Sequence, residues 1–458
     1  MLLVKRLPSI VAGRLSTRTL SQVLKSGKHG INVGELQTPL FNQVLQKSYS
    51  TETEKKERFG AVVVGSGPAG LAVVGNLLEQ KKGTILWVDD ANLRVFGGGR
   101  LHRAYRAVPS NTKVKFFTMF ADALEPFRQV TGKIPPPNPY SHLKQLDQER
   151  TCKIKAAVNL GIMLAQGFGD DEGVLKLSCR MHSASWSNDN HWNVKLNPSP
   201  KLPALSASSD LLFLCTGSHP TRDGIPDKSA QGIVSLDLDT CLNPKRLKLA
   251  LNRLMEESPK KDEKFTIAVI GASHSAILVL RNIYNLAANP PIEIFRNIRI
   301  KWLTRHELRY AEERDGWIKR DNTGLKGDVA IWAKGNLEID KLPTSQVSKC
   351  LEKVKISPES EQEDQDKHLQ GCDCVVHAIG FTKNDLPVIE RDGTALEINY
   401  DHETSGFVDA EGKIIRGLYG AGIAFPEKVV DPEGTTEYAV GLWKFMKYLK
   451  RVAPTWTA

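Results

Sequence analysis

Apolar runs that end at glycine-rich turns recur along this chain. Residues 59–64 are almost entirely apolar, and they lead directly into the turn Gly-Ser-Gly-Pro-Ala-Gly at 65–70 and then into the helix-forming residues 71–80. This order predicts a buried strand, a tight turn and a helix. A second apolar run, residues 84–88, ends at two aspartates. Strand, turn, helix and strand in this order predict one β–α–β unit.

The same pattern returns further along the chain. Residues 265–287 hold an apolar run, the turn Gly-Ala-Ser-His-Ser-Ala at 271–276 and a helix-forming stretch, and residues 298–303 form the next apolar run. Three more runs, residues 211–215, 374–380 and 417–422, also end at or next to glycine. The repeat predicts a second β–α–β unit, so the fold class is α/β.

The remaining stretches predict smaller features. Residues 174–179, 181–186 and 192–196 are expected to form short strands of a small accessory β-sheet, because polar turns separate them. The region around residues 97–99 and 135–137 is rich in glycine and proline and predicts loops. The charged residues 357–367 predict an exposed excursion, and residues 435–451 predict an amphipathic C-terminal helix.

Length and charge point to two domains behind a leader. The 458 residues exceed what a single core usually holds. Residues 1–50 carry +6 of the formal net charge of +10 and are rich in Ser, Thr and Leu. This composition predicts a mitochondrial transit peptide that is removed near residues 47–51, the alternative being a disordered basic tail. Because the charge gathers in the leader, it does not indicate a nucleic-acid partner.

Other classes of protein find little support in the composition. No apolar run approaches the roughly 18 residues of a membrane span. The seven cysteines are scattered and odd in number, which indicates reduced thiols rather than a disulfide scaffold. Cys372 and Cys374 lie close together but lead into an apolar strand, and no metal site is expected.

The first glycine turn predicts a nucleotide site. Its first glycine permits the tight bend, its second lets the backbone approach a pyrophosphate, and its third allows the helix to pack closely on the strand. The helix N-terminus then offers free amides to the phosphates, and an aspartate at the end of the second strand accepts from ribose hydroxyls. The residues assigned to this site are Gly65, Gly67, Pro68, Ala69, Gly70, and Asp89 or Asp90.

The second turn carries serines and an alanine where the first has its later glycines. Ser273 and Ser275 are expected to donate to phosphate below Gly271. His274 is a candidate phosphate contact too, although the sequence favours a solvent-facing turn histidine. Arg305 follows the next strand and suits the 2′-phosphate of NADPH, the alternative being an ordinary surface arginine.

These features together resemble the flavoproteins with two dinucleotide-binding domains, and among them flavin-containing monooxygenases and N-hydroxylases. The linker residues 213–217 and the return strand 373–381 are similar to theirs. The resemblance implies two Rossmann-like domains, with the NAD(P) domain inserted in the FAD domain, and FAD and NADPH as cofactors. The implied bounds are 58–225 and 371–458 for the FAD domain and 226–370 for the NADP domain.

The resemblance also implies roles for single residues. The stretch 97–113 is similar to the flavin-edge segment of the monooxygenases, whose asparagine corresponds to Asn111, the one residue assigned a catalytic role. A plain loop asparagine is the alternative. Residues 417–424 resemble the segment whose backbone meets the flavin, and the helix expected from 435 is directed at the flavin C2 carbonyl. The further cofactor-binding residues implied are Gly98, Arg100, Thr216, Gly217, Gly380, Gly422 and Ile423.

One departure from the family leaves the reaction open. The monooxygenases carry an F-x-G-x-x-x-H motif between their domains, and residues 230–236 here lack both its Phe and its His. The first prediction is hydroxylation of a small nucleophilic nitrogen, sulfur or carbonyl substrate. The alternatives are an NADPH reductase that passes electrons to a small acceptor such as a quinone, and a flavin-bound redox sensor or assembly factor with little turnover.

Overall fold

The computed structural model describes residues 58–89, 95–197, 204–222, 232–258 and 263–458. The expected leader, residues 1–50, and Asp90 lie outside these described residues. Residues 57–458 form one unit by their contacts, and only this unit is described below. It contains two large sheets, each with parallel strands and its own apolar core, so the predicted α/β class is confirmed.

The first sheet has a parallel centre of five strands. In spatial order they are β22 (Ile414–Gly420), β8 (Leu205–Leu214), β1 (Arg58–Val64), β2 (Ile85–Asp89) and β5 (Val174–Ser178). Ala61, Val62 and Val63 in β1 are fully buried, as expected for a parallel strand packed on both faces. β1 leads through the glycine turn into α3 (Pro68–Glu79), which confirms the predicted strand, turn and helix.

An antiparallel extension belongs to this same sheet. β6 (Arg180–Ser187) and β7 (His191–Asn197) form a hairpin that pairs with the first half of β8. The predicted small accessory sheet is wrong for residues 174–178, which are β5 and pair with β2 of the parallel centre, whereas the β6–β7 hairpin extends this sheet through β8. The remaining strands of this sheet are β18 (Val388–Arg391), β19 (Thr394–Ala395), β20 (Asn399–Tyr400) and β21 (Gly406–Val408).

Helices occupy most of the stretch that was expected to be loop-rich. Pro126 and Pro139 lie in the first turns of α6 and α7, where a missing backbone N–H costs nothing. The apolar side chains of these helices join the core around α3. The elements are α4 (Gly99–Ala104), β3 (Pro109–Lys113), α5 (Lys115–Asp122), α6 (Glu125–Lys133), α7 (Pro139–Gln145), β4 (Thr151–Lys153), α8 (Ile154–Gln166) and the 3₁₀ turn η1 (Asp170–Glu172).

The C-terminal helix begins later than expected. Residues 427–430 and 436–439 form the antiparallel hairpin of β23 (Glu427–Val430) and β24 (Thr436–Ala439). Helix α14 (Leu442–Val452) begins only after Gly441, whose φ of 144° excludes it from a helix. The predicted helix start near residue 435 is therefore wrong. α14 packs against α3 and α5, and the 3₁₀ turn η6 (Ala453–Thr455) ends the chain's regular structure.

The second sheet consists of five parallel strands. In spatial order they are β10 (Val234–Ser235), β16 (Cys374–His377), β11 (Phe265–Ile270), β12 (Ile298–Thr304) and β15 (Leu351–Lys355). The helices around it are α9 (Leu238–Leu242), α10 (Pro244–Glu257), α11 (His274–Ala288), α12 (Gly327–Asn336) and α13 (Glu361–Leu369), with 3₁₀ turns η3 (Glu293–Asn297), η4 (Leu342–Thr344) and η5 (Gln346–Lys349). Helix α13 occupies the expected exposed excursion, and its Leu369 is buried.

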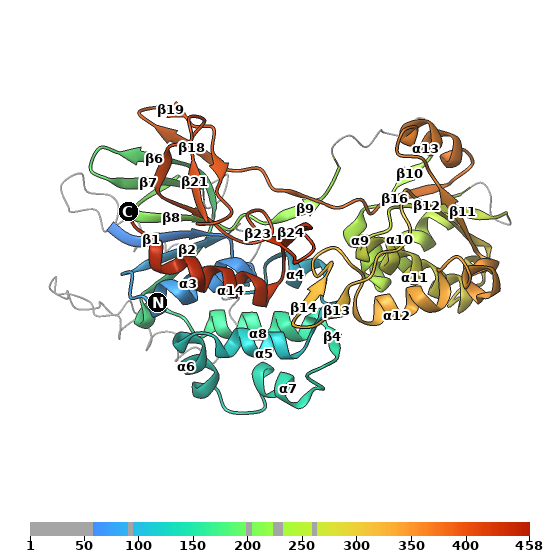
Figure 1. Ribbon diagram of the computed structural model, residues 1–458, viewed down its shortest axis with the longest axis horizontal. Coiled ribbons are helices and arrows are strands. Elements are labelled where there is room, and N and C mark those ends of the chain that lie inside the picture. Colours follow the sequence, from blue (N-terminus) through green and yellow to red (C-terminus); the bar gives the residue numbers. More distant parts are fainter. Residues whose placement is uncertain (1–57, 90–94, 198–203, 223–231, 259–262) are drawn as a thin grey trace, which may run out of the picture. The chain divides into compact units, whose positions relative to one another are not determined.

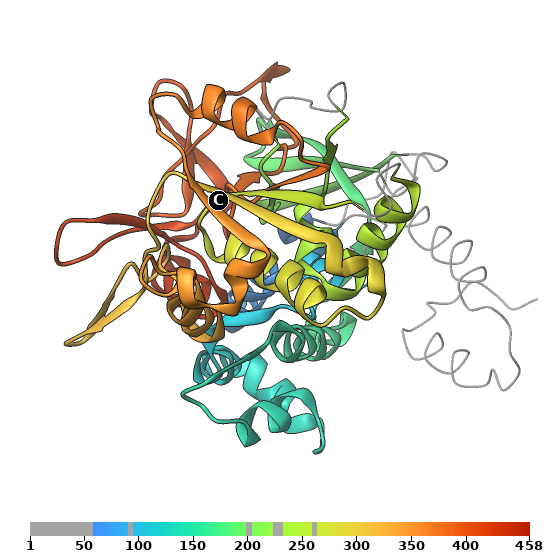
Figure 2. The same ribbon diagram turned by 90° about the vertical axis from the view of Figure 1, so that its right-hand side faces the viewer.

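The two sheets share one strand order, and the second interrupts the first along the chain. Strands β8, β1, β2 and β5 correspond in place to β16, β11, β12 and β15. The second sheet's strands all lie between β8 and β22 in the sequence (Figures 1 and 2). The connecting strands β9 (Ser218–Pro220) and β17 (Phe381–Lys383) pair with each other. Strand β16 lies beyond residue 370, where the sequence placed the boundary of the inserted part.

Candidate functional site

The first glycine turn is built from close backbone contacts. Gly65 has a φ of +110°, and a Cβ there would lie 2.2 Å from the carbonyl oxygen of Cys215 at the end of β8. A Cβ on Gly70 would lie 1.9 Å from the carbonyl oxygen of Gly65. A Cβ on Gly67, by contrast, would have no atom within 4 Å. Gly65 and Gly70 thus serve the fold, whereas Gly67 leaves open space at the N-terminus of α3, which begins with Pro68 and Ala69.

Two side chains of β2 hold this turn in place. The indole N–H of Trp87 donates to the carbonyl oxygen of Gly65 at 2.9 Å. The carboxylate of Asp89 accepts from the backbone N–H of Ser66 at 2.8 Å and also from its hydroxyl. Asp89 therefore stabilises the turn directly. Its expected contact with a ribose stays a prediction, as does that of Asp90.

The Gly97–Gly99 segment lies against the same turn. The N–H of Gly97 donates to the carbonyl oxygen of Ser66 at 2.9 Å. A Cβ on Gly99 would lie 2.8 Å from the Cα of Gly67. Arg100 forms an ion pair with Asp239 in α9, which also accepts from the hydroxyl of Tyr105. Gly98 thus lies between residues that touch the turn, while Arg100 connects this segment to the second sheet.

The second turn repeats the first almost atom for atom. Gly271 has a φ of +122°, and a Cβ there would lie 2.4 Å from the carbonyl oxygen of Ala378 at the end of β16. The indole N–H of Trp302 in β12 donates to the carbonyl oxygen of Gly271 at 2.7 Å. These contacts match those of Gly65 with Cys215 and Trp87. Both turns therefore make the same bend against corresponding neighbouring strands, β8 and β16, just before the N-termini of α3 and α11.

The polar residues of the second turn have distinct environments. Ser273 is exposed at the N-cap of α11 and donates its hydroxyl to the carbonyl oxygen of Ala378 at 3.2 Å. Ser275 is half-buried in the first helical turn. The alternative of a solvent-facing His274 is wrong, because both ring nitrogens are buried and have no hydrogen-bond partner. Burial, with Arg281 and Lys326 nearby, lowers the pKa of His274 to about 4.

Arg305 follows β12 on the surface near this turn. Its guanidinium donates to the carboxylate of Glu361 in α13 at 2.9 Å, and both side chains are partly exposed. A phosphate would therefore meet an arginine that already has an acidic neighbour. The role of Arg305 toward a 2′-phosphate stays a prediction.

Three strands end near glycines with positive φ angles, and exposed apolar side chains lie beside two of these glycines. Gly217, Gly380 and Gly422 have φ angles of +74°, +128° and +95°. The hydroxyl of Thr216 is buried without a partner, and its carbonyl oxygen accepts from Asn384 at 2.7 Å. Gly422 lies against α3, since its Cβ would come within 2.7 Å of Ala69. Ile379 and Ile423, beside two of these glycines, are 44% and 37% exposed.

Asn111 lies where the two sheets' elements meet. It is an exposed residue of β3, and its side-chain oxygen accepts from the hydroxyl of Thr112 at 3.2 Å. Gly327, the first residue of α12, has a φ of +57°, and its Cβ would lie 2.8 Å from Thr151 and 3.6 Å from the carbonyl oxygen of Ser110. The N-terminus of α12 thus lies directly on the strand that carries Asn111.

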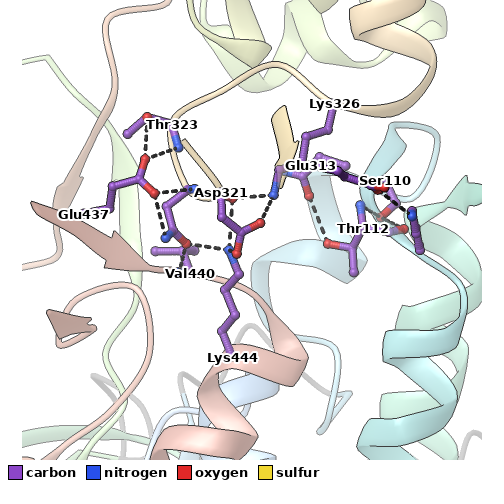
Figure 3. Close-up of polar contacts among 12 residues, drawn as sticks. Ser110, Thr112, Glu313, Asp321, Thr323, Lys326, Glu437, Val440 and Lys444 are labelled. Atoms are coloured by element: carbon purple, nitrogen blue, oxygen red, sulfur yellow. Dashed lines mark hydrogen bonds and ion pairs between the residues drawn. The ribbon is translucent and has the colours of Figure 1, made fainter. Parts of the chain in front are cut away.

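A segment after β12, which we call the strap, lies against the strand that carries Asn111. The strap, residues 312–326, contains β13 (Glu312–Arg314), β14 (Trp317–Lys319) and the polar turn before α12. In Figure 3 the carboxylate of Asp321 lies between Lys326 and Lys444, and Lys444 Nζ is 2.6 Å from Asp321 Oδ2. Burial alone would raise the pKa of Asp321, but these two lysines outweigh it and lower it. Burial and Lys326 lower the pKa of Lys444.

Glu437 of β24 fixes the strap at a second point. Its side chain is 5% exposed. One carboxylate oxygen accepts from the backbone and side-chain N–H of Asn322 at 3.1 and 3.2 Å, and the other accepts from the N–H and hydroxyl of Thr323 at 3.1 and 2.5 Å (Figure 3). Lys113 adds an outer ion pair with Glu313 at 2.7 Å. The strap thus ties the second sheet to both β3 and the β23–β24 hairpin.

The sequence pointed to part of this arrangement and missed the rest. Residues 315–322 of the strap form a polar stretch in the sequence, which is typical of a loop that covers a nucleotide or substrate. Nothing local marked Glu437 or Lys444, whose partners lie more than a hundred residues away along the chain. Within the described residues, no group of three or more His, Cys, Asp or Glu side chains is placed to hold a metal ion, and no helix is long and apolar enough to cross a membrane.

Comparison with known proteins assigns the chain to a family. No family model matches it. Monooxygenase AgnR1 from Paecilomyces divaricatus is 45% identical over 405 residues, which are 88% of this chain and 99% of that protein.

Two solved structures are similar over most of their length. DfoA from Erwinia amylovora, a cadaverine monooxygenase of desferrioxamine biosynthesis in a structure with bound FAD, has a TM-score of 0.41 at 14% identity, covering 86% of this chain and 82% of that one. The S-allyl-L-cysteine S-oxygenase from Allium sativum has a TM-score of 0.45 at 12% identity, covering 87% and 76%. Because it is 45% identical to AgnR1 along nearly all of that protein, the chain belongs to the same monooxygenase family as AgnR1.

Proposed function

We propose that this chain binds FAD at the first glycine turn and NADPH at the second, and that it adds an oxygen atom to a small nucleophilic nitrogen, sulfur or carbonyl substrate. The observation that carries the proposal is the pair of matched turns. Each places a bent glycine against a strand carbonyl just before the N-terminus of a long helix, and at the first turn Gly67 leaves open space at that helix end. Such a helix end offers free amides and a positive dipole to phosphates.

The residues around the first turn fit a flavin dinucleotide. Gly67 has room for a pyrophosphate, because no protein atom lies within 4 Å of where its Cβ would be. The buried hydroxyl of Thr216 has no protein partner and is available to a ligand. Ile379 and Ile423 expose apolar surface beside the glycines at the strand ends, as expected for groups that a flat aromatic ring covers.

The cofactors and the protein have different roles in the proposed reaction. When bound, the two cofactors supply hydride transfer and oxygen activation, which is chemistry of the cofactors themselves. The protein's part is to bind and orient them and to exclude water. We assign the positioning of the reacting edge to Asn111, whose strand is pressed by the N-terminus of α12, and the closure of this place to the strap.

A matched pair of glycine substitutions tests FAD binding at the first turn. Gly67→Ala has no steric conflict within the protein, and the φ of −73° at Gly67 suits alanine. We expect this variant to fold with normal yield and unfolding temperature in excess FAD but to bind FAD about tenfold or more weakly. Gly70→Ala forces a carbon to within 1.9 Å of a backbone oxygen, so it should lose stability as well as flavin. Unchanged FAD affinity in Gly67→Ala would contradict the proposed site.

Anaerobic mixing with NADPH tests the reaction. The purified flavoprotein is mixed with NADPH without oxygen, and air is then admitted while the flavin spectrum is recorded. Bleaching by NADPH followed by a long-lived oxygenated spectrum supports the monooxygenase reaction. Bleaching followed by immediate reoxidation without substrate favours a reductase that passes electrons to a small acceptor. Absence of bleaching rules out both and favours a redox sensor or assembly factor.

We also propose that residues 1–50 direct import into mitochondria. The support is the excess of seven basic residues over one acidic residue in this stretch, together with its Ser, Thr and Leu content. Incubation of the full chain with isolated mitochondria, with and without a membrane potential, tests this. We expect protection from protease that requires the membrane potential, together with a new N-terminus near residues 47–51. Protection that is the same with and without the membrane potential contradicts the proposal.

A further inference from the structure

His274 has an environment that the fold alone does not explain. It is the first residue of α11, directly after the second glycine turn. Both of its ring nitrogens are buried, and neither has a hydrogen-bond partner. Buried polar atoms are nearly always paired, because burying them unpaired is costly. An orphaned pair of ring nitrogens in the turn of a predicted nucleotide site therefore points to a missing partner from a ligand.

The charges around His274 are mainly positive. Arg281 lies two turns further along the same helix, and Lys326 lies at the N-cap of α12. The nearby carboxylates belong to other cations, since Asp321 pairs with Lys326 and Asp328 attracts Arg281. The helix dipole places further positive charge at the N-terminus of α11. Burial of the ring opposes protonation most, and the positive charges of Arg281 and Lys326 add to it, so the pKa of His274 is lowered to about 4 and the imidazole is neutral without a ligand.

An anion bound at the second turn would favour protonation of His274. Helix α11 has 15 residues and a free N-terminus, which suits a phosphate. A phosphate oxygen supplies the acceptor that the imidazole lacks, and its negative charge favours the protonated ring. The positive charges of Arg281 and Lys326, which oppose the proton in the free protein, also attract an anion to this turn.

We propose that His274 takes up a proton from solvent when the phosphates of a dinucleotide bind at the second glycine turn, so that nucleotide binding is linked to pH. The resulting imidazolium donates an N–H to a phosphate oxygen. This inference rests on the proposed NADPH site and adds its regulation. The direction follows from linkage: the ring's pKa is higher in the complex than in the free protein, so affinity rises as pH falls between those two values and is independent of pH above both.

Titration calorimetry of the FAD-loaded full chain with NADP⁺ measures this uptake. Binding is recorded at pH 6 in buffers that differ in ionisation enthalpy, and the slope gives the protons taken up. For the wild-type chain we expect roughly half a proton or more per nucleotide. NADP⁺ carries a phosphate monoester that itself titrates near pH 6, so the decisive quantity is the difference between the chain and its variants, in which that contribution cancels.

His274→Gln and His274→Asn keep a polar side chain but cannot gain a proton in this range. Each should bind NADP⁺ with an uptake lower by roughly half a proton and with a weaker dependence of Kd on pH. His182→Asn, at an exposed position in β6, is the matched control and should behave like wild type. Uptake equal in wild type and either variant overturns the inference, and so does a dependence of Kd on pH that is the same in wild type and variant. If wild type gives no binding heat and no spectral change with NADP⁺, the NADPH site itself is refuted, and this inference with it.

Discussion

The substitution Glu437→Gln tests whether the buried carboxylate holds the strap in place. Glu437 is 5% exposed, and each of its oxygens accepts two hydrogen bonds from Asn322 or Thr323. Glutamine has nearly the same shape, but its amide nitrogen must face one pair of these donors. The change therefore removes the charge and at least one accepted hydrogen bond without opening a cavity.

The size of the effect follows from the kind of bond that is lost. A hydrogen bond to a charged group contributes about 1.5–3 kcal/mol, and an unpaired buried donor adds a penalty of its own. Because the hydroxyl of Thr323 can rotate to become an acceptor, part of the loss is recovered. We expect opening of the strap to become easier by about 2–4 kcal/mol, which is a rise of roughly 30- to 700-fold in the open population.

Limited trypsin cleavage in the strap measures that population. Lys319 and Arg320 lie within it, and cleavage there follows the open fraction when opening is fast compared with proteolysis. The control is Glu433→Gln on the same hairpin, because Glu433 is 45% exposed and pairs with Lys319 at the surface. Such pairs contribute at most about 1 kcal/mol, so the control should cleave less than about fivefold faster. Equal cleavage rates in the two variants would refute the reasoning.

Two further predictions concern the second turn and the thiols. Arg305→Ala should weaken NADPH far more than NADH, and Glu361→Gln, which removes the acidic partner of Arg305, should strengthen NADPH; equal effects on both nucleotides in binding titrations would argue against a 2′-phosphate contact. All seven cysteines lie in the described part of the chain and form no disulfide, and burial raises the pKa of the fully buried ones such as Cys215. Alkylation of the native protein at pH 8 followed by mass spectrometry should therefore modify the half-buried Cys152 and Cys350 first, and early modification of Cys215 would contradict the described burial.

The parts of the fold that the sequence predicted are those set by local chemistry. A glycine turn between an apolar strand and a helix needs only a few neighbouring residues, so both turns lie where the sequence indicated them. The helices between β2 and β5 were missed because proline was taken as a breaker, whereas Pro126 and Pro139 begin helices. The start of α14 was missed because β24 depends on its pairing with β23, which no periodicity within 435–451 indicates.

The candidate site shows the same division between local and distant causes. The glycines and Asn111 could be named because each belongs to a short recognisable stretch. The burial of His274 could not, since it depends on residues near the start of α12, about fifty positions away along the chain. The pairing of Glu437 with Asn322 and Thr323 likewise joins two sheets whose strands are interleaved along the sequence.

The differences between the two matched turns suggest why one chain has both. At the first turn a carboxylate, Asp89, accepts from the backbone of Ser66. At the equivalent position after Trp302 the second sheet has a threonine hydroxyl, Thr304, which contacts only its own turn. The second turn therefore lacks the carboxylate that the first turn has at this position, which favours a ligand with more phosphate groups. An anion that binds beside His274 also brings negative charge near Lys326, which pairs with Asp321 of the strap and precedes the helix end that contacts the strand of Asn111. Occupation of the second site and the position of the strap are therefore expected to be coupled.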